Sequence, residues 1–311
     1  MELAVIVAHQ IVIMFILIGI GIIVLKKGIV TIESTKNYSN FLLMIVTPAL
    51  IINAYQRELV KEQLEGLIFS FILAIIFHIL SIIVVKLIIR KRKSTDYKVE
   101  QMGAIYSNCG FMGFPVLSAL LGQDGMLYGT AFVGVFNIFL WTNGISLLSN
   151  DTKLSIKKIF LNPGVIGVIV GLILYFTQIK LPSVIGESIG YIASLNTPLA
   201  MIITGVFLAN VDMKATLKNI NIYKSVLLRI LILPLMMLIL IKITNFENWI
   251  SGGYEVALSH IISCSCPAAS STILLVTKMN LNSEHGAELV AISTLLCVIT
   301  IPILTIIFNV L

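Results

Sequence analysis

Ten apolar segments follow one another along the chain, and they restrict it to one class of fold. Each is roughly 20 residues long, the length that an α-helix needs to cross a bilayer. Of the 311 residues, 58% are hydrophobic and 12% are charged, and the mean hydropathy is +1.03. Such a chain has too little polar surface to cover a soluble domain. The sequence therefore predicts an all-α polytopic membrane protein with ten transmembrane helices, near residues 3–25, 38–55, 64–89, 99–121, 126–148, 159–179, 183–211, 222–243, 254–278 and 288–308.

The basic residues predict the orientation of the chain. Loops on the cytoplasmic side of a membrane protein carry an excess of Lys and Arg. The even-numbered loops hold Arg57, Lys61, Lys180 and Lys242. The odd-numbered loops hold many more: Lys26, Lys27, Lys36, Arg90, Lys91, Arg92, Lys93, Lys98, Lys153, Lys157, Lys158, Lys214, Lys218, Lys224 and Lys278. We therefore expect cytoplasmic odd loops and both termini outside the cell. The net charge of +6 follows from this pattern and requires no nucleic-acid partner.

The first segment predicts a retained helix. It lacks a basic region before its apolar core and a small-residue cleavage site, both of which a signal peptide carries. Lys26 and Lys27 follow the apolar core instead.

Two prolines interrupt apolar segments in matching halves of the chain. Pro115 lies in segment four and Pro267 in segment nine, each among Gly, Ser, Cys or Asn. Unwound backbone inside a bilayer is tolerated only where it lines a cavity or binds a ligand. We therefore expect both helices to unwind and cross at these prolines. The simpler alternative is that the prolines only kink their helices and that nearby hydroxyls satisfy the freed carbonyls.

Short motifs indicate an internal repeat. Thr47-Pro48 in segment two matches Thr197-Pro198 in segment seven, and Pro115 and Pro267 stand at nearly the same offset within their segments. A repeat of five helices reverses the direction of the second copy. The sequence thus predicts two inverted five-helix repeats, with broken crossover helices four and nine and a site near the midplane.

Together these motifs resemble the auxin efflux carrier family, which is related to the bile acid transporter fold. The resemblance covers nearly the whole chain and is carried by the following residues: Asn108 to Pro115, Asn162-Pro163, Gly171, Leu181-Pro182, Pro198, Gly205, Leu208-Ala209, Pro267, Ser293 to Leu296 and Pro302.

The resemblance implies an elevator-type transporter and a homodimer. It assigns residues 1–55 and 159–211 to a scaffold domain and residues 64–148 and 222–309 to a transport domain. The plant members have a long loop between segments five and six. Here Ser149 to Lys158 form a short one, so the chain resembles the compact bacterial form and is expected in the bacterial inner membrane.

The residues around the breaks predict an anion site. The N-terminal end of a helix carries free N–H groups and partial positive charge. Hydroxyl and amide donors add to this, and they suit a carboxylate. The predicted substrate-binding residues are Asn108, Gly110, Gly113, Pro115, Ser263, Ser265, Pro267, Ser270 and Ser271, with Thr272 beside them. The family resemblance implies that Asn108 contacts the substrate carboxylate; the alternative is a hydrogen bond between helices.

His260 is the candidate for proton coupling. It lies seven residues before Pro267, as Asn108 lies seven before Pro115, and histidine titrates near neutral pH. The alternative is a water-facing histidine at the outer interface.

For the other polar residues and for a set of glycines we expect mainly structural roles. Arg229 is expected to reach the cytoplasmic interface, and Gly164, Gly167 and Gly171 are expected to form a face for close helix packing. His9, Gln10 and His78 are expected to pair between helices. We expect mainly packing and hydrogen bonding, and only secondarily the lining of a site, from Asn137, Trp141, Thr142 and Asn143.

The pattern predicts no metal site, no cofactor and no catalytic residues. The four cysteines form neither a zinc motif nor a disulfide framework, and paired carboxylates and a His-Glu-x-x-His helix are absent from the sequence. We therefore predict a secondary transporter of small organic anions, auxin-like or malate-like monocarboxylates or dicarboxylates. The alternatives are an intramembrane sensor and a serine-type intramembrane hydrolase that uses His260.

Overall fold

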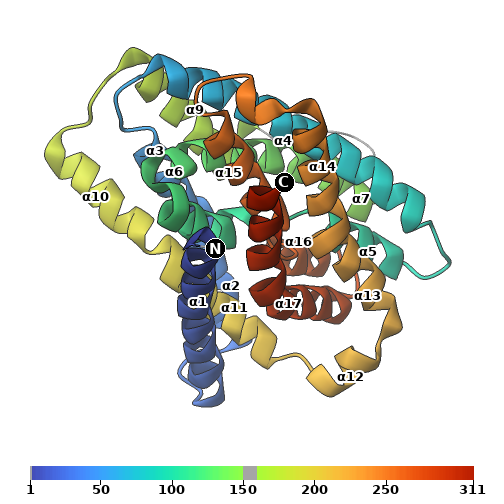
Figure 1. Cartoon of the computed structure of the whole chain (residues 1–311). Coiled ribbons are helices and arrows are strands. Elements are labelled where there is room, and N and C mark those ends of the chain that lie inside the picture. The colour runs from blue at the N-terminus through green and yellow to red at the C-terminus, as the bar shows by residue number, and fades with distance from the viewer. Residues whose placement is uncertain (1, 150–159) are drawn as a thin grey trace.

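Helices account for all the regular secondary structure in the part of the chain that the computed structural model describes, residues 2–149 and 160–311. They pack around one extended hydrophobic core. Figure 1 shows a bundle in which α10 lies at the left, α11 passes close to α1 at the lower left, and α5 and α13 lie toward the right.

The elements of the first half are α1 (Glu2–Lys26), α2 (Ile32–Phe41), η1 (Leu42–Val46), α3 (Thr47–Ala54), α4 (Lys61–Ile88), α5 (Asp96–Ile105), η2 (Cys109–Gly113), α6 (Phe114–Phe139), η3 (Leu140–Gly144) and α7 (Ile145–Leu148). Those of the second half are α9 (Pro163–Thr177), α10 (Ser183–Ser194), α11 (Asn196–Ala209), α12 (Met213–Lys218), α13 (Ile220–Leu227), η4 (Leu228–Ile232), α14 (Leu233–Thr244), η5 (Phe246–Asn248), α15 (Gly253–Ser265), α16 (Ser271–Lys278) and α17 (Ser283–Val310).

Seven helical runs among the described residues are long and apolar enough to cross a membrane. The chain is therefore a multi-pass membrane protein, and the count of ten is not confirmed. Expected segments four and five fall within one run, Cys109–Leu148, but the backbone of Gly122 is non-helical (φ +57°, ψ −132°), so two helices meet at Gly122, between the two expected segments. Among the described residues of expected segment six, α9 spans Pro163–Thr177, and expected segment nine is interrupted between α15 and α16. Lys153, Lys157 and Lys158, on which the predicted orientation partly depends, lie outside the described residues.

Three prolines widen their helices without breaking them. A π-helical stretch of five residues ends two positions before each of Pro48, Pro115 and Pro234. Proline lacks an N–H and clashes with the preceding turn, and a wider turn accommodates both defects. The expectation that segment four unwinds at Pro115 is therefore wrong. The backbone is helical from Cys109 through Pro115, and it is irregular over Tyr106 to Asn108.

Glycines allow two helix pairs to approach closely. A Cβ atom on Gly205 of α11 would lie 2.0 Å from the Ile18 carbonyl oxygen of α1, and one on Gly21 would lie 2.2 Å from that of Ile202. In the same way Gly167 meets Pro48 and Gly171 meets Tyr55, which joins α9 to α3. The glycine face predicted on segment six does pack against a neighbouring helix.

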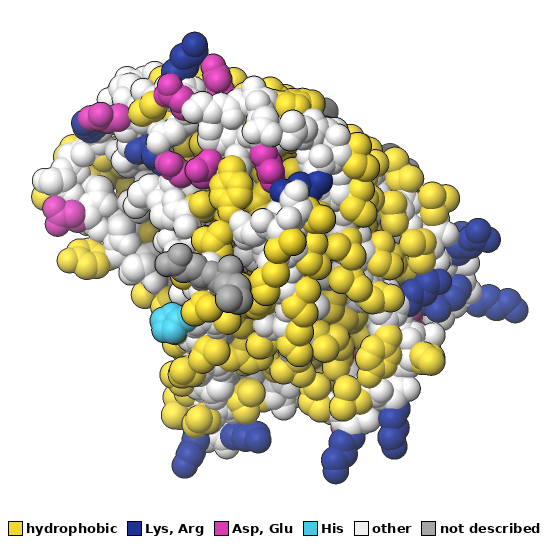
Figure 2. All heavy atoms as spheres, viewed as in Figure 1, with side chains coloured by type: hydrophobic (Ala, Val, Ile, Leu, Met, Phe, Trp, Pro, Cys, Tyr) yellow, Lys and Arg dark blue, Asp and Glu magenta, His cyan; other side chains and the backbone are white. Residues whose placement is uncertain are grey.

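The surface separates by side-chain type. Figure 2 shows a broad face of hydrophobic side chains, with Lys and Arg at the lower end and right edge, and with the visible Asp and Glu, together with further Lys and Arg, toward the top and upper left. A belt of apolar side chains between two charged ends is the arrangement that a bilayer requires.

Candidate binding site at two paired chain breaks

Two irregular segments, one from each half of the chain, are hydrogen-bonded to each other. The Asn108 N–H donates to the Pro267 carbonyl (2.8 Å), and the Ala269 N–H donates to the Tyr106 carbonyl (2.9 Å). Ser107 and Ala268 thereby form an isolated antiparallel bridge. We call residues 106–108 and 266–270 the crossing. Two main-chain hydrogen bonds therefore hold the two irregular segments together, which satisfies buried backbone groups that the broken helices leave free.

Arg229 closes the crossing from one side. Its Nη1 donates to the carbonyls of Ala104 (3.1 Å) and Ile105 (2.8 Å), and its Nη2 donates to that of Cys264. These carbonyls end α5 and α15, the two helices that lead into the crossing. The side chain is 0% exposed. The expectation that Arg229 reaches the cytoplasmic interface is therefore wrong.

Asn108 stands where the crossing meets a cavity. It is 4% exposed, and its Nδ2 approaches the Ser270 hydroxyl at 3.4 Å, a long hydrogen bond. Ser107 and Ser271 line the same cavity, and their hydroxyls have no hydrogen-bond partner among the described residues. A buried polar group without a partner costs free energy, so these hydroxyls are available to a ligand. Ser107 is not among the site residues that the sequence predicts, although it directly precedes Asn108.

The cavity has a volume of about 440 Å³ and lies between two groups of helices. One wall comes from α2, η1 and the start of α9, and the other from η2, α6 and α16. Lys36 and Lys278 are exposed and mark its open end, and no Asp or Glu stands among the described residues that line it. The remaining lining is mostly apolar, with Phe111, Phe136 and Trp141 beside amide groups of Asn40, Asn137 and Asn162.

Residues 6–305 match the family model described as membrane transport protein. The chain belongs to this membrane transport protein family. The match confirms the resemblance to the auxin efflux carriers noted from the motifs. An uncharacterized transporter of Methanothermobacter thermautotrophicus is 22% identical over 93% of this chain and 94% of its own length. An uncharacterized transporter of Methanocaldococcus jannaschii is 25% identical over 94% of this chain and 95% of its own length.

A second cavity has a volume of about 490 Å³, and none of the residues that line it belongs to the crossing. Pro115 lines this cavity instead of the first one, together with Gln10, Asn53 and Ser118. Asn196, at the start of α11, also lines it, and its Nδ2 donates to the carbonyl of Gly110 at 3.1 Å. Gly110 faces the first cavity. The contact between Asn196 and Gly110 therefore lies between the two cavities, and sequence reasoning had no signal for it.

Other predicted site residues turn away from the cavities or pack beneath them. The Ser265 hydroxyl donates to the Ile261 carbonyl of its own helix (2.5 Å), and Ser263 is buried within α15. A Cβ atom on Gly113 would meet the Cys266 sulfur at 3.5 Å. Of the residues proposed in segment nine, the structure thus brings Pro267, Ser270 and Ser271 to Asn108 at the crossing.

His260 lies in the interior of the transporter. It is 0% exposed, with Nδ1 2.9 Å from the Val256 carbonyl and Nε2 2.9 Å from the Ser70 carbonyl of α4. The water-facing interpretation is therefore wrong. Because both ring nitrogens face carbonyls, the ring is not placed to activate a serine, which disfavours the hydrolase alternative.

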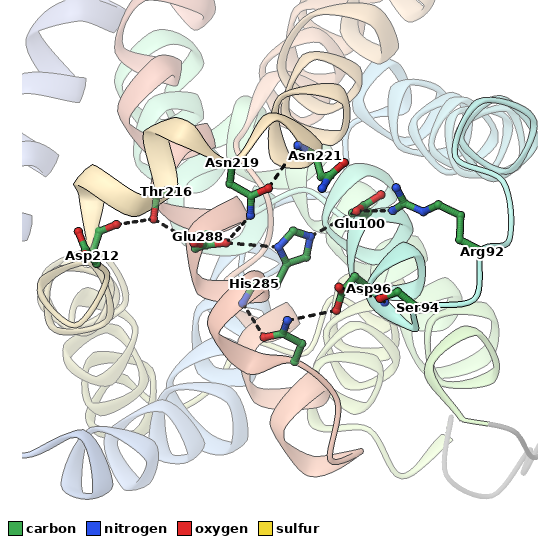
Figure 3. A network of polar contacts seen from close by, with 11 residues as sticks. Arg92, Ser94, Asp96, Glu100, Asp212, Thr216, Asn219, Asn221, His285 and Glu288 are labelled. Atoms are coloured by element: carbon green, nitrogen blue, oxygen red, sulfur yellow. Dashed lines mark hydrogen bonds and ion pairs between the residues drawn. The ribbon is translucent and has the colours of Figure 1, made fainter.

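A separate polar network joins the start of α17 to neighbouring segments (Figure 3). Glu288 accepts hydrogen bonds from Thr216 (3.2 Å) and Asn219 (3.1 Å), and the His285 ring lies 3.3 Å from Glu288 and 3.4 Å from Glu100. The network ties α12, which follows α11, to α5 and α17.

Asp96 belongs to the same network. Burial raises the pKa of its carboxyl, but hydrogen bonds from Ser94 and Asn282 outweigh burial, and the pKa lies below its ordinary value.

Within residues 2–149 and 160–311, no group of three His, Cys, Asp or Glu side chains is arranged to hold a metal ion. The four cysteines are free and buried.

Proposed function

We propose that this chain is a secondary transporter of small organic anions, a monocarboxylate or dicarboxylate class, and that it binds the carboxylate at the crossing. The observation that carries this proposal is the first cavity. Its inner end holds the Asn108 amide and the unpartnered hydroxyls of Ser107 and Ser271, and its open end holds Lys36 and Lys278. Neutral donors and distant cations attract an anion without holding it too tightly to be released.

The helix ends support the same chemistry. η2 and α16 begin at the crossing and direct their first N–H groups toward it. Apolar and aromatic walls then accept the body of the substrate, and the amides of Asn40, Asn137 and Asn162 can orient a second polar group. A cavity of about 440 Å³ has room for a small carboxylic acid of either type.

Transport is proposed to follow an elevator-type alternating-access mechanism. The scaffold would comprise residues 1–55 and 159–211, and the moving domain residues 64–148 and 222–309. The close pairs α1 with α11 and α3 with α9 support a rigid scaffold built from two inverted repeats. Both cavities lie between the proposed domains, one on each side of the Asn196 to Gly110 contact, as alternating access requires.

The proposed orientation places both termini outside the cell and opens the first cavity to the cytoplasm of a bacterial inner membrane. Lys36 and Lys278 at its open end, from loops one and nine, support this direction. A homodimer through the scaffold is proposed on the family resemblance and on the exposed apolar faces of α1 and α10.

The test is a thermal-shift screen of purified protein against acetate, malonate, malate and indole-3-acetate, followed by uptake into proteoliposomes. Amines with the same carbon skeletons serve as controls. We expect at least one carboxylate to raise the unfolding temperature and to be taken up, and the amines to do neither. Equal binding of amines, or the absence of any carboxylate uptake, would contradict the proposal.

A further inference from the structure

Arg229 carries a full positive charge in the protein interior, and no described carboxylate forms a salt bridge with it. A buried charge without compensation is very costly. What surrounds the guanidinium is a set of three backbone carbonyls, from Ala104, Ile105 and Cys264, and the ring of Phe77, 5.6 Å from Cζ. The compensation must therefore come mainly from the main chain.

The two helix ends supply a matching charge. The C-terminal end of an α-helix carries about half of an elementary negative charge, located on its last free carbonyls. α5 ends at Ile105 and α15 ends at Ser265, and both ends point at Arg229. Two half charges balance one guanidinium, so this side of the crossing is close to neutral.

Without the positive charge of Arg229, the crossing would favour a cation over an anion. Carbonyl oxygens that converge from two helix ends form the kind of site that binds an alkali cation. The same crossing also presents the positive ends of η2 and α16 to the cavity. Whether it attracts anions depends on which pair of helix ends is neutralised.

We propose that Arg229 is a built-in counter-cation, which neutralises the C-terminal ends of α5 and α15 so that the crossing attracts anions and requires no bound sodium or potassium ion. This inference rests on the proposed function for its account of anion selectivity. The charge balance itself can be tested without any substrate. Arg229 acts here through the helix ends, as a positioning residue.

The decisive variant is Arg229→Ala, purified in detergent and unfolded by heat with added guanidinium chloride or with equal concentrations of urea. Guanidinium restores both charge and donors, and urea restores donors alone. We expect the unfolding temperature of the variant to fall by about 4 °C or more. Millimolar guanidinium should restore it saturably, and urea should not. Equal rescue by urea, or no rescue by guanidinium, would overturn the proposal.

A second pair of variants covers the case in which Arg229→Ala does not fold. Arg229→Lys keeps the charge with fewer donors, and Arg229→Gln keeps donors without the charge. We expect the Lys variant to be recovered and to unfold at the higher temperature. Equal or lower stability of the Lys variant would count against a role of charge.

Sodium independence is measured on the wild-type protein. Replacement of sodium by potassium or choline at constant ionic strength should leave the unfolding temperature and malate uptake unchanged. Saturable dependence on sodium would overturn the inference. If wild type takes up no carboxylate while guanidinium rescues Arg229→Ala, the proposed function fails and the counter-cation role stands.

Discussion

The side-chain amide of Asn196 donates a hydrogen bond to the backbone carbonyl of Gly110 at 3.1 Å, across the boundary between the proposed scaffold and moving domains. The Oδ1 atom of the same amide is buried and has no partner among the described residues. Asn196 is thus only half satisfied in this state. A contact that forms in one position of a moving domain must break in the other.

Asn196→Ala should therefore speed exchange without weakening substrate binding. Removal of the hydrogen bond destabilises the present state by about 1 kcal/mol, which shifts the equilibrium between two states several-fold. Malate counterflow in proteoliposomes measures exchange, and thermal shift measures affinity. A loss of affinity with unchanged exchange would instead make Asn196 a substrate ligand.

Asn108→Ala should weaken carboxylate binding by about 10- to 100-fold. A hydrogen bond to a charged group contributes about 1.5–3 kcal/mol, and 1.4 kcal/mol corresponds to a factor of ten. The matched control is Thr277→Val. Thr277 lines the same cavity, but its hydroxyl already donates to the Ile273 carbonyl (2.7 Å). Equal losses in the two variants would show that the cavity wall, and not the crossing, determines binding.

Gly21→Ala should destabilise the protein, although alanine is the better helix former. The new methyl group would lie 2.2 Å from the Ile202 carbonyl oxygen and would push α1 away from α11. Overpacking of this kind costs about 1–3 kcal/mol. Gly19→Ala is the control, because a Cβ atom at Gly19 meets nothing within 4 Å and should stabilise α1 by up to about 1 kcal/mol. Unfolding temperatures of the two variants should move in opposite directions.

Stability should depend on acid pH through Asp96. Its folded-state pKa is below the ordinary value, so its contribution is present above an unfolded pKa of about 3.9 and is lost as pH falls through the folded pKa. The unfolding temperature of Asp96→Asn should therefore drop less than that of wild type between pH 5 and pH 3. Glu62→Gln removes a charge at the start of α4, outside this network, and serves as the control. The same drop in wild type and Asp96→Asn would contradict this assignment.

Proton linkage through His260 is a separate prediction. A neutral imidazole can donate to only one of the Val256 and Ser70 carbonyls, whereas the cation can donate to both and would hold α15 to α4. We expect malate affinity to rise from pH 8 to pH 5.5 in wild type and less so in His260→Gln. His78→Gln, which alters a buried histidine that lies on α4, should keep the wild-type profile. Identical profiles in all three would assign the proton to the substrate acid.

The family and the two segments that meet at the crossing could be predicted from the sequence. The positions at which the two helices break could not. Gly and Ser around two prolines correctly indicate weak helices. Proline alone does not show whether a helix breaks or widens, because the outcome depends on what the freed carbonyls can bind. At Pro115 a π-turn absorbs the defect, and the break falls at Tyr106 to Asn108, where Pro267 and Ala269 supply main-chain partners.

Long-range partners explain the other errors. Arg229 stands near one end of an apolar segment, a position at which an arginine ordinarily extends to the interface. Its acceptors are backbone carbonyls 124, 125 and 35 residues away, and backbone carbonyls leave no mark in the sequence. The water-facing alternative for His260 is wrong for the same reason, since its partner carbonyl on Ser70 is 190 residues distant.

The bridge between Ser107 and Ala268 is made by backbone atoms alone. The shape of the crossing therefore does not depend on the side chains that would select a substrate. The side chains that would select a substrate, such as Asn40, Asn137 and Trp141, come from helices outside the crossing. Substitutions there would change which substrate fits while the crossing keeps its shape. Relatives that share little more than a fifth of their residues with this chain could therefore keep one transport mechanism and carry different cargoes.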